Sequence, residues 1–214
     1  SHPPYFLLIG IPGLEKEQFW IAFPFCTTYG IALLGDITLL LVIRGEPMYL
    51  FLAMLAFTDL VLSTSTLPKM LSIFWLGWRD IGFPSCLAQL FFIHTFSTVE
   101  SGVPMVVALD RYVATCCPLW HSSILSGPVV GALGSLVLGR GVLPVSPTCL
   151  LLRWRKFCQH HVIPHSYCEH MALVKLACGD TRVHVIHGLF VAFLMLISVS
   201  YTMVLPSREA KLKS

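Results

Sequence analysis

The chain has little charge and no asparagine among its 214 residues. Charged residues make up 12% of it, whereas they make up about 25% of an ordinary soluble domain. Hydrophobic residues make up 56%, and a soluble chain of this length could not bury so much apolar surface. Without asparagine there is no N-glycosylation sequon. The composition therefore predicts a protein that crosses a membrane several times.

Signatures of other protein classes are also lacking. No cluster of Lys and Arg marks a nucleic-acid-binding surface, and the net charge of +3 is small. The chain has no Gly-rich phosphate loop, no His-Glu-x-x-His and no nucleophile elbow, so we expect no enzymatic activity. No charged segment with a cleavage site precedes the first apolar segment, so we expect that segment to act as the insertion signal.

Five apolar segments approach the roughly 20 residues that a membrane-crossing helix needs. We expect all five to be helices, because a bilayer admits only helices or closed barrels and these runs do not alternate as barrel strands do. The last is the weakest, since His184 and His187 lie near its start. The five segments are 19–43, 49–75, 85–114, 128–152 and 183–205.

The orientation follows from the cysteines rather than from the basic residues. Cys86, Cys158, Cys168 and Cys178 all fall on the side of the long polar connection 153–182, which fits an oxidising compartment. A count of Lys and Arg slightly favours the opposite orientation, but long loops weaken that rule. We therefore expect residues 1–18 and 153–182 outside the cell. Residues 206–214 would then begin a cytoplasmic loop.

Two interpretations of the long connection stay open. Clustered cysteines in an oxidising compartment favour disulfides, although spacing alone does not give their connectivity. A zinc or copper site is the alternative, because imidazole, thiolate and carboxylate are the ligands that these metals bind. The potential ligands are His160, His161, His165, Cys168, Glu169 and His170.

The third apolar segment ends in the charged triplet Asp110-Arg111-Tyr112. Cys86 and Arg111 are 25 positions apart, or about 37 Å along a helix, so they are expected at opposite edges of the bilayer. Glu100 and Arg111 fall on one helix face, which should point into the bundle. Charge at a membrane edge is either functional or a snorkelling interfacial pair.

Six stretches carry family motifs from one end of the chain to the other: 6–15, 46–52, 108–116, 163–170, 175–180 and 206–213. Taken together, they resemble the fish-like class (class I) of olfactory receptors, within the rhodopsin-like G-protein-coupled receptors. The resemblance implies an all-α membrane protein with a disulfide-linked extracellular loop. It implies a single seven-helix receptor domain over residues 1–214, incomplete because the sixth and seventh helices are not among these residues.

The resemblance also implies a function and partners. A small-molecule odorant would bind between the helices and open the cytoplasmic face to a stimulatory heterotrimeric G protein, at the plasma membrane. Arg111 would hold the inactive state and then contact the G protein, with Asp110 as its ion partner and Tyr112 beside it. The alternative is a non-signalling truncated receptor that stays in the endoplasmic reticulum or associates with full-length receptors. A small transporter is a weaker alternative, since no inverted repeat is seen.

The binding residues implied by the resemblance lie higher in the bundle. His94 matches a position that lines the ligand pocket, and a histidine donor suits the carboxylate of an acidic odorant. A satisfied interhelical histidine is the alternative interpretation. The implied disulfides pair Cys86 with Cys168 and Cys158 with Cys178.

Acidic residues are expected at one depth of the bundle. Asp59 and Glu100 match a buried acidic pair of the family that resembles a sodium site. Asp36 stands where the family has Asn, and three carboxylates cannot all ionise together without a cation. Two protonated acids packed in the bundle are the alternative. Pro104 stands inside the third helix where the family has an aliphatic residue.

Overall fold

The computed structural model describes residues 4–14, 16–42, 47–157, 161–179 and 181–213. Five helices among them are long and apolar enough to cross a membrane, which confirms the predicted number of spans. Their bounds lie within two residues of the predicted ones, except at the end of the last helix. They are α1 (Gln18–Val42), α2 (Pro47–Leu76), α3 (Phe83–Cys116), α5 (Gly127–Trp154) and α7 (Arg182–Lys213).

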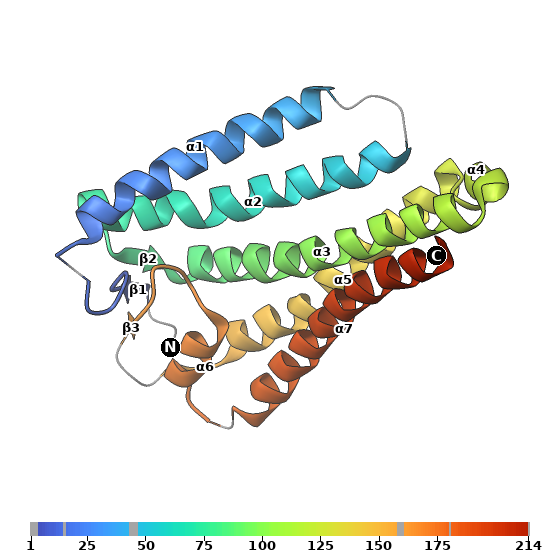
Figure 1. The fold of residues 1–214 in the computed structure, drawn as a ribbon. Helices are drawn as coiled ribbons and strands as arrows, with labels where there is room; N and C mark the ends of the chain where they lie inside the picture. Colours follow the sequence, from blue (N-terminus) through green and yellow to red (C-terminus); the bar gives the residue numbers. More distant parts are fainter. Residues whose placement is uncertain (1–3, 15, 43–46, 158–160, 180, 214) are drawn as a thin grey trace.

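The central helix of the bundle is α3. It packs against α2, α5 and α7, while α1 packs mainly against α2. Figure 1 shows α1 and α2 side by side on one flank of α3, with α5 and α7 on the other. The amino-terminal strand and the carboxyl end of α7 lie at opposite ends of the bundle (Figure 1). The helix α3 is therefore the element that connects α2, α5 and α7.

Small residues allow α3 and α5 to approach closely. A Cβ atom on Gly141 of α5 would lie 2.7 Å from the backbone oxygen of Thr95 on α3. A Cβ atom on Gly102 of α3 would lie 3.0 Å from a methyl group of Val137 on α5. Helices in membranes associate through such small-residue contacts, because lipid removes most of the hydrophobic driving force between them.

A small sheet covers the end of the bundle at which α3 begins. Strand β1 (Tyr5–Leu8) pairs antiparallel with β2 (Asp80–Gly82) and parallel with β3 (Val162–Ile163). Phe6 and Leu8 point inward and are fully buried. Figure 1 places the sheet beside the start of α3 and near the short helix α6 (His170–Leu176). The sequence did not predict this sheet, because strands of two to four residues show no usable alternation.

The helix α7 continues beyond the predicted span. The candidate membrane span is Arg182–Thr202, close to the predicted 183–205, and α7 continues to Lys213. Residues 206–213, which the sequence places at the start of a cytoplasmic loop, are thus helical. Arg, Glu, Ala, Lys and Leu predominate in this segment and are strong helix formers. Between α3 and α5 lie η1 (Pro118–Trp120) and the one-turn helix α4 (His121–Ile124).

Candidate ligand pocket and switch residues

The predicted loop disulfide is present. Cys86 of α3 is bonded to Cys168, with their Cα atoms 5.5 Å apart. Next to it, the backbone N–H of Cys168 donates a hydrogen bond of 3.0 Å to Oε1 of Gln89. Cys178 is also disulfide-bonded, but its predicted partner Cys158 lies outside the described residues. The long connection is thus attached covalently to the start of α3.

The disulfide places α6 over the end of the bundle. Glu169 caps α6, since its Oε2 atom accepts a hydrogen bond of 3.1 Å from the N–H of Ala172. The same oxygen lies 3.4 Å from Nε2 of His165. His170, the first residue of α6, is buried. Cys168 and His170 therefore face the helices, while the side chain of Glu169 between them is partly exposed.

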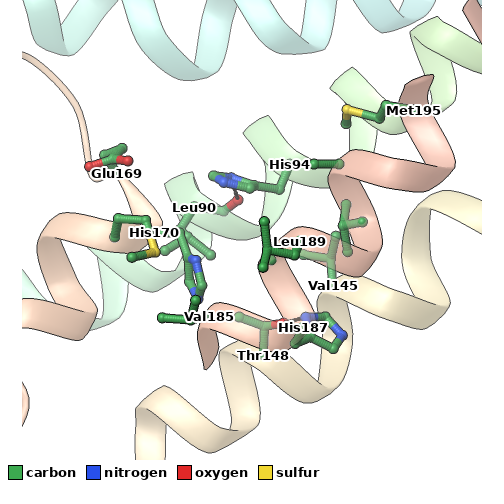
Figure 2. A pocket seen from close by; sticks show the side chains of 14 residues that line it. Leu90, His94, Val145, Thr148, Glu169, His170, Val185, His187, Leu189 and Met195 are labelled. Carbon is green, nitrogen blue, oxygen red and sulfur yellow. Dashed lines mark hydrogen bonds between the residues drawn. The ribbon is translucent and has the colours of Figure 1, made fainter. Parts of the chain in front are cut away.

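Beneath α6 lies a cavity of about 450 Å³ between α3, α5, α6 and α7. Its lining is mostly apolar with a few polar groups, which is typical of a small-molecule site. Figure 2 shows His94 projecting from α3, with Leu189 and Val145 below it and with Thr148 and His187 at the far end. The residues that line it are Leu90, His94, Val145, Thr148, Glu169, His170, Met171, Val185, His187, Gly188, Leu189, Val191, Ala192 and Met195.

His94 lies on the wall of this cavity, and its contact with a ligand stays a prediction. Its Nδ1 atom is 3.1 Å from the carbonyl oxygen of Leu90, one helical turn earlier. Its ring centroid is 6.1 Å from that of His170. The hydrogen bond recorded for His94 is therefore within α3 rather than between helices, and the ring lines the cavity.

Further polar groups of the site were not singled out as ligand contacts from the sequence. His170 and His184 have ring centroids 5.8 Å apart. Thr148 and Nδ1 of His187 are hydrogen-bonded at 2.9 Å across α5 and α7. In the sequence, His184 and His187 stand out because they lie in an otherwise apolar span. Nothing in the sequence indicated that α6 would place His170 between α3 and α7.

Two of these histidines have buried nitrogens. Among the described residues, no hydrogen-bond partner faces Nε2 of His170 or either ring nitrogen of His184. Burial lowers the pKa of His170 to about 4, and the neighbouring His94, His184 and His187 act in the same direction. His170 is therefore a neutral ring near pH 7.

The charged triplet lies at the opposite end of α3. Asp110 is buried with 5% of its surface exposed, whereas Arg111 is exposed. Arg111 lines a second cleft of about 370 Å³ together with Leu52 and Leu55 of α2 and Thr202 of α7. The ion pair between Asp110 and Arg111 stays a prediction, as does the role of Tyr112.

Asp59 interacts with each of the other two acids. The carboxyl group of Glu100 lies within hydrogen-bonding reach of that of Asp59. Asp36 is close enough to Asp59 for their charges to interact. Glu100 and Arg111 both lie near α2, on one side of α3 as their spacing predicts, but Arg111 is exposed rather than enclosed by the bundle.

Arg140 pairs within the bundle. Its Nη2 atom donates a hydrogen bond of 2.8 Å to the carbonyl oxygen of Leu194 in α7. This contact satisfies a guanidinium at membrane depth and links α5 to α7.

The metal alternative finds no support in the part of the chain that the structure describes. There, no three His, Cys, Asp or Glu residues are arranged so that they could hold a metal ion. Cys168 is in a disulfide and cannot serve as a thiolate ligand. His160 lies outside the described residues.

Five membrane-length helices, a loop disulfide on the central helix and a triplet of Asp, Arg and Tyr at its other end define a partial helical bundle of the G-protein-coupled receptor class. The family model described as olfactory receptor matches residues 25–214. The chain therefore belongs to the olfactory receptor family, and it is a multi-pass membrane protein.

Human receptors are among its relatives. Olfactory receptor 52R1 of Homo sapiens is 58% identical, over 100% of this chain and 73% of that receptor. Olfactory receptor 52N4 of Homo sapiens is 50% identical, over 95% of this chain and 67% of that receptor. Olfactory receptor 52K2 of Homo sapiens is 49% identical, over 100% of this chain and 74% of that receptor.

Proposed function

We propose that the chain binds a small odorant in the cavity beneath α6 and passes the signal to a stimulatory heterotrimeric G protein at the end of α3. The observation that supports this most is the cavity itself. It is mostly apolar, and His94 lines it at the end of the bundle that carries the Cys86–Cys168 disulfide. An apolar cavity with a few polar groups suits a volatile molecule with one polar group.

The proposed signal path runs along α3. His94 and Arg111 lie on this one helix, at the upper cavity and the lower cleft respectively. A ligand that favours one arrangement of α3 against α7 shifts the equilibrium between closed and open cytoplasmic faces. Asp110, Arg111 and Tyr112 would then act as the switch.

We also propose that Asp59 and Glu100 hold a sodium ion. Two carboxyl groups within hydrogen-bonding reach either share a proton or bind a cation between them. Asp36 adds a third acid to the same region. Such a cation would stabilise α2 against α3 near the middle of the bundle.

Surface labelling and a cyclic AMP assay in intact cells test the receptor function. The chain carries one tag at its amino terminus and another at its carboxyl terminus. We expect labelling of the amino-terminal tag only, and an odorant-evoked rise in cyclic AMP that Arg111→Ala abolishes while surface labelling is unchanged. A surface-exposed chain that responds to no member of a broad odorant panel contradicts the proposal.

A second candidate is a non-signalling membrane protein that is retained in the endoplasmic reticulum or associates with full-length receptors. The observation in its favour is that Arg111 is exposed and lines an open cleft with α2 and α7. This candidate predicts that neither tag is labelled at the cell surface.

A further inference from the structure

The hydrogen bond of His94 within α3 determines what its ring can offer to a ligand. Nδ1 lies 3.1 Å from the carbonyl oxygen of Leu90. A carbonyl oxygen only accepts hydrogen bonds, so Nδ1 carries the hydrogen. A neutral imidazole has one N–H, which leaves a lone pair on Nε2. On the neutral His94 ring, which lines the cavity, Nε2 is therefore an acceptor and not a donor.

The charges around His94 also disfavour an anionic ligand. Two titratable groups lie near the ring. One is the carboxylate of Glu169, the N-cap of α6, whose charge acts on His94, and the other is the imidazole of His170, whose ring centroid is 6.1 Å away. His184 and His187 of α7 interact with His170, and His187 also lines the cavity. Among the described residues that line the cavity there is no Lys or Arg. A carboxylate would thus enter an apolar cavity that already holds a negative charge, and no fixed cation lines the described wall.

The other histidines near the cavity do not supply the positive charge that a carboxylate ligand would need. His170 has a pKa of about 4, so it carries no charge near pH 7. His187 shares its Nδ1 with the Thr148 hydroxyl. Arg155 interacts with His184, and neither residue is among those that line the cavity.

We propose that a ligand is recognised through a hydrogen that it donates to Nε2 of His94, so that a carboxylic acid binds together with one proton. This inference rests on the proposed odorant-binding function and refines its ligand class to small hydrogen-bond donors. The hydrogen of the complex lies on the ligand oxygen or on Nε2 of His94. In both cases the complex holds one proton more than the neutral protein and the ionised acid do when they are apart in water.

Three probes with the same carbon chain separate the possibilities: hexanoic acid, hexanol and methyl hexanoate. Above about pH 6 a free carboxylic acid is ionised, so binding of hexanoic acid must take up one proton. Its affinity then falls about tenfold for each unit that the pH rises. Hexanol brings its own hydroxyl hydrogen and binds without proton uptake. Methyl hexanoate has no hydrogen to donate and binds much more weakly.

Isothermal titration calorimetry of the full chain in lipid nanodiscs counts the protons directly. Titrations between pH 7 and 8, in buffers of different ionisation enthalpy, should give about one proton per hexanoic acid and none per hexanol. His94→Gln offers an amide N–H that bonds a carboxylate without a proton, so its proton uptake should fall to near zero. His161→Gln is the matched control, because His161 is an exposed loop histidine that does not line the cavity.

The outcomes separate this inference from the proposed function. Hexanoic acid that binds without proton uptake overturns the inference and leaves odorant binding intact. Binding of methyl hexanoate that is as tight as binding of hexanoic acid also overturns the inference and leaves odorant binding intact. If none of the three probes nor any member of a broad odorant panel binds, the proposed function fails and the inference fails with it. The wild-type proton count decides the question even where a variant does not fold.

Discussion

Gln89 and Cys168 are joined by a hydrogen bond of 3.0 Å from the buried backbone N–H of Cys168 to the side-chain oxygen of Gln89. Gln89 also donates from Nε2 to the carbonyl oxygen of Ser65 in α2, at 2.9 Å. One amide therefore connects α2, α3 and the long connection next to the disulfide. A residue that satisfies a buried backbone donor and acceptor at once should be costly to remove.

We expect Gln89→Ala to destabilise the protein by about 1–3 kcal/mol, the cost of leaving buried polar groups unpaired. A thermal unfolding assay in detergent measures the change. Ser135→Ala is the matched control, since the exposed Ser135 hydroxyl bonds only within its own helix. A melting temperature for Gln89→Ala equal to that of the control would show that the contact does not hold the loop.

The Cys86–Cys168 disulfide should matter more than any free cysteine. It closes a loop of 82 residues, and loss of a native disulfide from a small domain costs about 2–5 kcal/mol. We expect Cys86→Ser and Cys168→Ser each to reduce the yield of folded protein several-fold, as judged by size-exclusion chromatography. Cys149→Ser, at a free and partly buried cysteine, should leave the yield nearly unchanged.

The lowered pKa of His170 predicts a loss of stability in acid. Folding lowers this pKa from its usual 6.5 to about 4, so between these values the unfolded chain binds the proton and the folded chain does not. Stability then falls as the pH drops through this window, by an amount on the order of 1–3 kcal/mol. His170→Phe keeps a ring of similar size but cannot titrate, so its melting temperature should decline less between pH 6.5 and 4. Equal declines for the two proteins would contradict the assignment.

Pro104 is expected to weaken α3. It lies inside the helix, where it removes the N–H that would bond the carbonyl oxygen of Glu100, one turn earlier. Its side chain is exposed, so a leucine has room there. A proline inside an ordinary helix costs about 3 kcal/mol, and membrane helices tolerate proline better. Pro104→Leu should therefore stabilise the protein by about 1–3 kcal/mol, nearer to the lower value. Phe92→Leu on the exposed face of α3 is the control, and no gain over it would show that the helix carries no strain at Pro104.

The proposed sodium site gives a salt-specific prediction. Replacing choline chloride by sodium chloride at equal ionic strength should raise the melting temperature of the wild-type chain. Asp59→Asn removes one carboxylate of the pair and should abolish the difference. A shift of equal size in both proteins would indicate a general salt effect and no site at Asp59 and Glu100.

The spans were predictable from the sequence because each is a long apolar run with few charges. The disulfide between Cys86 and Cys168 and the place of His94 came from the resemblance to a family. The polar end of the cavity was not foreseen, because Thr148 and His187 meet only once α5 and α7 pack together. The sheet was missed for a related reason, since β1 gains its partners β2 and β3 from segments about 75 and 155 residues further along the chain.

Photo-crosslinking tests most directly whether the cavity beneath α6 is the odorant site. The purified chain is irradiated with a diazirine analogue of hexanoic acid, and the labelled residues are located by mass spectrometry. The account predicts labels on cavity residues such as Leu90, Val145 and Val185, and their loss when excess hexanoic acid or hexanol competes. Labels confined to outward-facing residues of α1, such as Ile31 and Leu34, and unaffected by competition would contradict it.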